Sequence, residues 1–141
     1  MSIRRRRECG KCQYRFSTLE EMELLDVTVV KSDGKRENYN REKVEKGIRQ
    51  SLTKRPFTDD IFRRLINAIE RDIQKRLGKS WTRGTKTKEI TTKQIGDIVM
   101  KHLRKFDKVA YIRFASVYRS FEDVKTFQRE ARSLLVRKKA R

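Results

Sequence analysis

A strand signal followed at once by a turn signal and a helix start constrains this chain most. The strand signal is a group of three valines: Val27, Val29 and Val30. Asp33-Gly34 follows them, and because glycine tolerates the positive φ of a tight turn, the pair predicts a two-residue hairpin. The returning strand would hold Glu37 to Tyr39. Asn40 then supplies the short acceptor side chain that is typical of a helix N-cap.

The same stretch gathers polar groups that suit a ligand bearing phosphates. Lys31 ends the first strand, and Lys43 falls in the first turn of the helix, beside backbone N–H groups without intrahelical partners. A cation there opposes the helix dipole, unless a polyanion lies between the lysines and the helix terminus. Glu37 and Asn40 would then face ribose or base polar groups. The alternative is a solvated hairpin whose lysines only favour solubility.

Helical periodicity accounts for most of the remaining chain. The expected helices run from Asn40 to before Pro56, from Thr58 to Gly78, from a cap at Thr91 or Thr92, over Val109–Phe121 and over Val124–Val136. The helix over Val109–Phe121 is apolar on nearly all sides, which predicts that it lies in the middle of the bundle. Arg113 and Arg119 would be its two positions that face solvent or a ligand. Residues 79–89 lack a period and predict a basic loop. The expected class is α+β, mainly helical, with a small β-hairpin cap.

Charge sets the class of partner. The 141 residues include 38 Lys or Arg and 19 Asp or Glu, for a formal net charge of +19. This excess implies an anionic partner, and DNA, RNA and acidic membranes all qualify. No apolar run approaches the roughly 18 residues of a membrane span, and no signal-peptide core follows residues 1–7. We therefore expect a cytoplasmic protein without a membrane partner.

The sequence contains no pattern that predicts catalysis. There is no legible Ser-His-Asp set, Walker loop or pair of carboxylates in a pocket, and the single histidine limits general-base chemistry. We therefore expect a non-enzyme.

The N-terminal segment carries the two cysteines, Cys9 and Cys12, spaced C-x-x-C. Residues 4–18 are too few for a core of their own, and the spacing suggests metal or redox chemistry before a structural disulfide. A zinc ribbon closes a tetrahedral thiolate site with two such knuckles, and only one is present. His102 falls on a predicted helix and is a poor substitute ligand. A thioredoxin-like dithiol lacks the βαβ context that it needs.

Three blocks of this sequence resemble one protein family. The first block resembles the ATP-cone, a regulatory module that binds nucleotides. It consists of V-V-K-S-D-G-K-R-E-x-x-N-x-x-K at residues 29–43 together with Lys54-Arg55-Pro56. ATP-cones are found in ribonucleotide reductases and in the NrdR family, whose members are bacterial repressors of the reductase genes. The arginine run and cysteine pair up to Glu20 resemble the second half of the NrdR zinc ribbon, and residues 107–121 its last core helix. The similarity covers residues 3 to 127.

The resemblance implies a domain organisation and a set of ligands. A partial zinc ribbon would occupy residues 1–20, an ATP-cone residues 27–126, and a C-terminal helix with a basic tail residues 127–141. ATP and dATP would be effectors, bound by Lys31, Glu37, Asn40, Lys43, Lys54 and Arg55. Part of the adenine pocket would come from Thr91, Thr92, Gln94 and Ile95. Without the resemblance, Lys54 and Arg55 are ordinary partners of a helix C-terminus.

The resemblance also assigns the N-terminal segment to double-stranded operator DNA. The expected DNA-binding residues are Arg4, Arg5, Arg6, Arg7, Lys11 and Arg15, because a guanidinium fork can grip phosphates or a guanine edge. Cys9 and Cys12 would be the zinc ligands, although the family's first cysteine pair is missing upstream of the arginines. Three explanations stay open: a start codon assigned too late, a shortened ribbon that lacks zinc, or two chains that each donate two thiolates.

Three functions follow. The first is a nucleotide-sensing repressor of ribonucleotide reductase genes, in which the identity of the nucleotide shifts the assembly of a homo-oligomer. The second is a general basic nucleic-acid-binding or ribosome-associated protein with a structural cone. The third is a detached ATP-cone that regulates the reductase itself.

Overall fold

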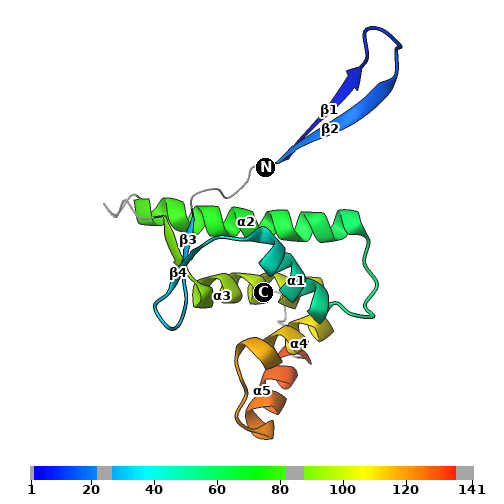
Figure 1. Ribbon diagram of the computed structural model, residues 1–141. Coiled ribbons are helices and arrows are strands. Elements are labelled where there is room, and N and C mark those ends of the chain that lie inside the picture. The colour runs from blue at the N-terminus through cyan, green and yellow to red at the C-terminus, as the bar shows by residue number, and fades with distance from the viewer. Residues whose placement is uncertain (1, 22–26, 82–87, 136–141) are drawn as a thin grey trace, which may run out of the picture.

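The computed structural model describes residues 2–21, 27–81 and 88–135 (Figure 1). Strands β1 (Ser2–Glu8) and β2 (Arg15–Glu21) form an N-terminal hairpin. The other elements are β3 (Thr28–Val30), β4 (Arg36–Asn38), α1 (Arg41–Ser51), α2 (Asp59–Trp81), β5 (Glu89–Thr91), α3 (Thr92–Phe106), α4 (Lys108–Tyr118) and α5 (Val124–Leu135). The mainly helical α+β class is thus confirmed. The basic tail from residue 136 and most of the 79–89 loop lie outside the described residues.

The part of the chain after the N-terminal hairpin contains a three-stranded sheet in the order β4-β3-β5. β3 pairs antiparallel with β4 and parallel with β5, so that Val29 lies opposite Glu37 on one side and Ile90 on the other. Both apolar side chains are buried. β5 falls at the end of the segment expected to be a loop, and no pattern in the sequence predicts it.

The turn between β3 and β4 has three central residues instead of the expected two. The Gly34 N–H donates to the Lys31 carbonyl at 2.9 Å, and the Lys31 N–H donates to the Lys35 carbonyl at 2.8 Å. Gly34 has a φ of +83°, the left-handed conformation that closes a type I turn in a hairpin of this length. The glycine therefore has its predicted role, in a turn one residue longer.

The core lies between the four helices α1 to α4 and the inner face of the sheet. α2 supplies its longest apolar stripe: Phe62, Leu65, Ile66, Ile69 and Ile73. This helix continues past Gly78 to Trp81, so the predicted stop at the glycine was wrong. An interior glycine costs a helix only about 1 kcal/mol, which packing can offset. Within the described residues, no helix is both long and apolar enough to cross a membrane.

α4 is less enclosed than predicted. Ala110, Tyr111 and Ala115 are buried, but 82% of Val117 is exposed, so one side of the helix faces solvent. Arg113 of this helix and Arg119 at its C-cap both have protein partners. Arg113 Nη1 donates to the Thr53 carbonyl at 2.6 Å, beyond the end of α1. Arg119 Nη1 lies 3.0 Å from Glu130 Oε2 on α5. Both therefore bind neighbouring elements.

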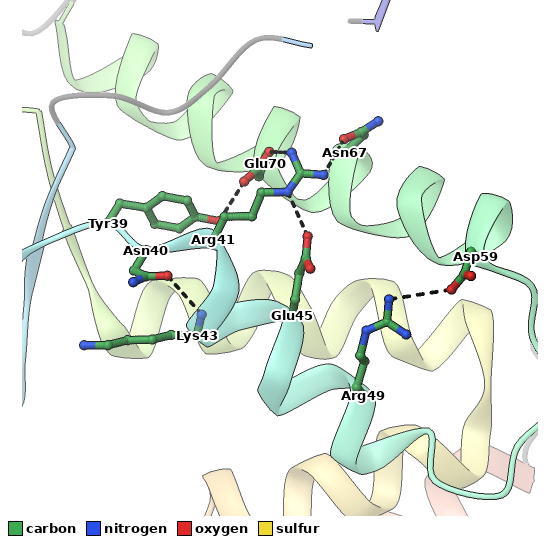
Figure 2. A network of polar contacts seen from close by, with 9 residues as sticks. All are labelled: Tyr39, Asn40, Arg41, Lys43, Glu45, Arg49, Asp59, Asn67 and Glu70. Atoms are coloured by element: carbon green, nitrogen blue, oxygen red, sulfur yellow. Dashed lines mark hydrogen bonds and ion pairs between the residues drawn. The ribbon is translucent and has the colours of Figure 1, made fainter. Parts of the chain in front are cut away.

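A buried carboxylate fixes the start of α1 against α2 (Figure 2). Glu70 is only 4% exposed, and it accepts a hydrogen bond from Tyr39 Oη at 3.1 Å. Its other oxygen lies 3.0 Å from Arg41 Nη1. Burial, followed by the charge of Glu70, raises the pKa of Tyr39 well above its usual range, so the phenol remains the donor. The end of β4 and the first turn of α1 are thereby held on one point of α2.

Candidate functional site

A cavity of about 290 Å³ opens where β4 meets the start of α1. Its polar lining comes from Glu37, Asn38, Asn40, Lys43 and Thr92. Its apolar lining comes from Val29, Val44, Gly47, Ile95, Gly96, Val99, Phe114, Tyr118 and the ring of Tyr39. Three helices, α1, α3 and α4, and the β3–β4 hairpin thus enclose a space with one polar side.

Two ammonium groups meet one carboxylate at the polar side. Glu37 Oε2 lies 3.0 Å from Lys31 Nζ and 3.1 Å from Lys43 Nζ. Hydrogen bonds from Lys31 and then Lys43 hold the pKa of Glu37 below its usual value, so the carboxylate is ionised. This group of three side chains thus has a net charge of +1, and it is open to solvent.

Asn40 is the N-cap of α1, as predicted. Its Oδ1 accepts the Lys43 backbone N–H at 3.2 Å, and its own backbone is extended. The positive end of the α1 dipole therefore lies at the side of the cavity that Asn40 and Lys43 line.

Aromatic rings from α4 form the apolar wall. Phe114 and Tyr118 stack with centroids 5.8 Å apart and planes 28° apart. Tyr118 Oη donates to the Lys93 carbonyl at 2.6 Å, which holds the ring against α3. The ring lies over Gly96, where a Cβ would be 2.1 Å from Tyr118 Cε2. The apolar pattern of residues 109–121 predicts a helix in the middle of the bundle and does not mark either ring as part of a site. A glycine within a strongly periodic helix is the signal that indicates such a close approach.

The start of α3 forms the side of the cavity next to this wall. Thr91 and Gln94 cap the helix reciprocally, with Gln94 N donating to Thr91 Oγ1 at 3.1 Å and Thr91 N donating to Gln94 Oε1 at 3.1 Å. Thr92 and Ile95 line the cavity itself. Of the four residues that the resemblance placed around adenine, two therefore face the space and two fix the helix beside it.

Lys54 and Arg55 lie at the other end of α1. That helix has 11 residues and is therefore roughly 16 Å long, so its two ends cannot contact the same phosphate group in this arrangement. Arg55 Nε lies 2.8 Å from Asp107 Oδ2, the residue that caps α4. Lys54 is exposed with a φ of 61°. The structure thus brings Lys31, Glu37, Asn40 and Lys43 together and places Lys54 and Arg55 elsewhere.

The N-terminal hairpin divides its arginines between two faces. Arg5 Nε lies 2.8 Å from Glu20 Oε1, and Arg7 Nε donates to Thr18 Oγ1 at 3.2 Å. Arg4 and Arg6 point to the opposite face, since side chains alternate along a strand, and they have no ion pair or hydrogen bond among the described residues. At the tip, Lys11 is exposed, and Arg15 Nε pairs with Glu8 Oε2 at 2.8 Å.

The cysteine knuckle forms the tip of this hairpin. The Cys9 N–H donates to the Tyr14 carbonyl at 2.9 Å, and Gln13, with a φ of 58°, donates to the Cys9 carbonyl at 2.9 Å. Hydrogen bonds from the backbones of Cys12 and Lys11 lower the pKa of Cys9, which favours the thiolate. A thiolate pair suits zinc, but the described residues contain no cluster of three or more potential ligands. His102 is on α3 beside Asp72, with 2.9 Å between Nε2 and Oδ2.

Comparison with known proteins agrees with the two parts of the chain. Residues 27–124 match the ATP cone domain, and residues 1–20 match the N-terminal domain of NrdR-like transcriptional repressors. A transcriptional repressor NrdR from Lysinibacillus sphaericus is 43% identical over 135 residues, which cover 96% of this chain and 81% of the relative. One from Clostridioides difficile is 43% identical over 137 residues, covering 97% and 84%. One from Thermoanaerobacter sp. is 44% identical over 142 residues, covering 95% and 79%. This chain belongs to the NrdR family of transcriptional repressors, and an ATP-cone forms its larger part.

Proposed function

We propose that this protein is a repressor of ribonucleotide reductase genes that senses ATP and dATP in the cone and binds operator DNA through its N-terminal hairpin. The family is one of regulators, which agrees with the expectation of a non-enzyme. The observation that carries the proposal is the pair of lysines held by Glu37 at the polar mouth of an otherwise apolar cavity.

An adenine nucleotide matches both ends of this cavity. The base would lie against the Phe114–Tyr118 wall, because an aromatic face gains from stacking as well as from burial. The phosphates would lie at Lys31 and Lys43, where charge-assisted hydrogen bonds and the N-terminus of α1 act together. Glu37 and Asn40 would be left to the ribose or to polar edges of the base. A free triphosphate would use only the polar half, so adenine nucleotides should bind more tightly.

Lys54 and Arg55 have an indirect place in this proposal. Arg55 binds Asp107, and Asp107 caps the helix that supplies the aromatic wall. Arg55 would therefore position α4 instead of contacting phosphate. Lys54 would reach a nucleotide only if the end of α1 moved toward it.

The hairpin has the charge that a DNA-binding element requires. Arginine forks bind phosphates and guanine edges, and Arg4 and Arg6 are both without protein partners in the described structure. Cys9 and Cys12 would fill two positions of a four-coordinate zinc site. Because the described residues offer no third ligand, no step of the proposed mechanism depends on the metal.

Sensing requires that ATP and dATP bind with different affinities to different assembly states of the chain. The test is a gel shift in which the protein is titrated onto a ribonucleotide reductase promoter from the same genome, in the presence of ATP or of dATP. Light scattering measures the size of the oligomer under the same conditions. We expect the two nucleotides to give different DNA affinities and different assemblies. If neither nucleotide changes DNA binding or assembly, the sensing repressor is wrong and a general basic nucleic-acid-binding protein takes its place.

A further inference from the structure

The outer face of α2 carries a row of basic side chains directly opposite the core. Successive residues of a helix are rotated by about 100°, so Arg64, Arg71 and Lys75 fall within about 20° of one line. The buried stripe from Phe62 to Ile73 lies on the other side. All three basic residues are exposed. From Arg64 to Lys75 the row extends for roughly 16 Å along a straight rod.

The four acidic residues of α2 have their nearest basic partners outside this row. Asp59 lies 3.7 Å from Arg49, and Asp60 lies 4.0 Å from Arg63. Glu70 is turned inward to Tyr39 and Arg41. Asp72 lies at the flank, where its shortest contact is 2.9 Å to His102, and its pair with Lys75 is longer, at 3.8 Å. Arg64 and Arg71 have no ion pair in the part of the chain that the structure describes. The fold thus separates charges that are mixed in the sequence.

The row begins beside the N-terminal hairpin. Arg4 and residues 17–19 of the hairpin share a polar hollow of about 360 Å³ with Asp60, Arg63, Arg64 and Asn67 of α2, so that three arginines and one carboxylate line it. Figure 1 shows the hairpin rising from this side of α2. Arg4, which is without a partner among the described residues, therefore lies around the same hollow as Arg64, where the two basic surfaces adjoin.

We propose that the Arg64–Arg71–Lys75 face of α2 is a second DNA-binding surface, which contacts the phosphate backbone of the duplex that the hairpin engages. This inference rests on the proposed function. Duplex DNA carries one charge per about 1.7 Å of its axis, so a straight row of this length lies opposite several phosphates. An acidic protein fits less well, because no large apolar side chain is exposed between residues 64 and 75 to serve as the centre of a protein interface.

Phosphate contacts hold a protein on the duplex without reading its sequence. The surface should therefore add affinity equally for operator and for unrelated DNA, and it should add to the salt dependence of binding. Removing one arginine that binds a phosphate should reduce the slope of log K against log salt by about 0.9.

The test compares three double variants of the full chain by fluorescence anisotropy, with the promoter duplex and a scrambled duplex of equal length over a range of salt concentrations. Arg64→Gln with Arg71→Gln removes the row. Arg129→Gln with Arg132→Gln removes the same charge from exposed positions of α5 and is the matched control. Arg4→Gln with Arg6→Gln tests the hairpin. Glutamine nearly equals arginine in helix propensity, and thermal unfolding checks that each variant is folded.

We expect the α2 variant to lose about tenfold or more in affinity for both duplexes and to reduce the slope by about 1.8, while the α5 variant matches the wild type. If the α2 and α5 variants behave alike while the hairpin variant loses binding, the second surface is wrong and the proposed function stands. A loss confined to the promoter duplex would indicate base reading and would overturn the backbone contact. If the wild type binds neither duplex, both proposals fail.

Discussion

Gly96 lies against the ring of Tyr118 so closely that no side chain fits between them. A Cβ at position 96 would be 2.1 Å from Cε2 and 2.2 Å from Cζ of that ring. The hydroxyl of Tyr118 is tied to the Lys93 carbonyl, so the ring cannot move away without losing that hydrogen bond. The apolar wall of the cavity thus depends on the absence of a single methyl group.

Gly96→Ala should therefore displace the Tyr118 ring, destabilise the fold by about 1–3 kcal/mol and weaken dATP binding. Gly78→Ala is the control, because a Cβ there meets nothing within 4 Å and alanine favours a helix by about 1 kcal/mol. Thermal unfolding and calorimetry with dATP measure both effects. A stable Gly96→Ala protein with normal dATP affinity would show that Tyr118 is not part of the site.

Lys43→Glu should reduce the affinity for ATP and dATP by more than tenfold, because it places a negative charge beside the phosphates in addition to removing a donor. Lys31→Glu should act in the same way. Lys46→Glu provides the control, since Lys46 is exposed on the same helix and does not line the cavity. Equal binding by the Lys43 and Lys46 variants in calorimetry would remove the lysine pair from the proposed site.

The Arg55–Asp107 pair predicts a dependence of stability on pH. Burial alone would raise the pKa of Asp107, but hydrogen bonds from the Ala110 N–H and Arg55 outweigh it and lower the pKa. Because the pKa of Asp107 is lower in the folded chain than the value of about 3.9 in the unfolded chain, the ionised carboxylate stabilises the fold at pH values above about 3.9. This stabilisation is lost as the pH falls through the pKa of the folded state. Arg55→Gln should cost about 1 kcal/mol at neutral pH, since the arginine is partly exposed, and its Tm should approach that of the wild type below about pH 4. A constant difference in Tm across this range would contradict the prediction.

Glu70→Ala should be among the most destabilising single changes in α2. It leaves Tyr39 and Arg41 without their shared acceptor, and breaking a buried charge pair costs about 3–5 kcal/mol. Glu45→Gln removes a second carboxylate from Arg41, 2.8 Å away, but that side chain is 30% exposed and should cost less than about 1 kcal/mol. Figure 2 shows both carboxylates beside Arg41. Chemical denaturation of both variants measures the difference in stability. Equal losses of unfolding free energy would show that the burial of Glu70 does not increase its contribution to stability.

Zinc should bind this 141-residue chain at less than one equivalent, because one cysteine pair fills only half of a tetrahedral site. Titration with zinc in competition with a chromophoric chelator, together with mass determination, separates the possibilities. Half an equivalent accompanied by dimers would indicate a site shared between two chains. Tight binding of one equivalent to a monomer would disprove the prediction and direct attention to other ligands.

Local chemistry explains what could be predicted from the sequence. The Asn40 cap, a cap at Thr91 or Thr92 and the turn glycine Gly34 each depend on residues a few positions apart, and the structure has caps at Asn40 and Thr91 and a left-handed Gly34. The same holds for the apolar stripe of α2, whose spacing alone determines its buried face. Lys31, Glu37, Asn40 and Lys43 come together for this reason, since one turn and one helix start connect them.

Features that depend on long-range packing were not predictable. β5 is a strand only because β3 lies beside it, and three residues at the end of a basic segment carry no period of their own. The separation of Lys54 and Arg55 from the lysine pair follows from the length of α1 and from the position of Asp107, which no local pattern reveals. The cavity wall likewise requires that Tyr118 of α4 cross Gly96 of α3.

The parallel pairing of β3 with β5 also determines the order in which the protein can be completed. All of α1 and α2 lies between the two strands in the chain, so the pairing closes a long loop and cannot precede the synthesis of β5. During translation, the edge of β3 that pairs with β5 therefore stays without a neighbouring strand until Ile90, the partner of Val29, has left the ribosome. The N-terminal hairpin requires only its own strands, and it leaves the ribosome before β3 and β5 do. A newly made chain would therefore carry its basic hairpin before it has a cavity with which to sense a nucleotide.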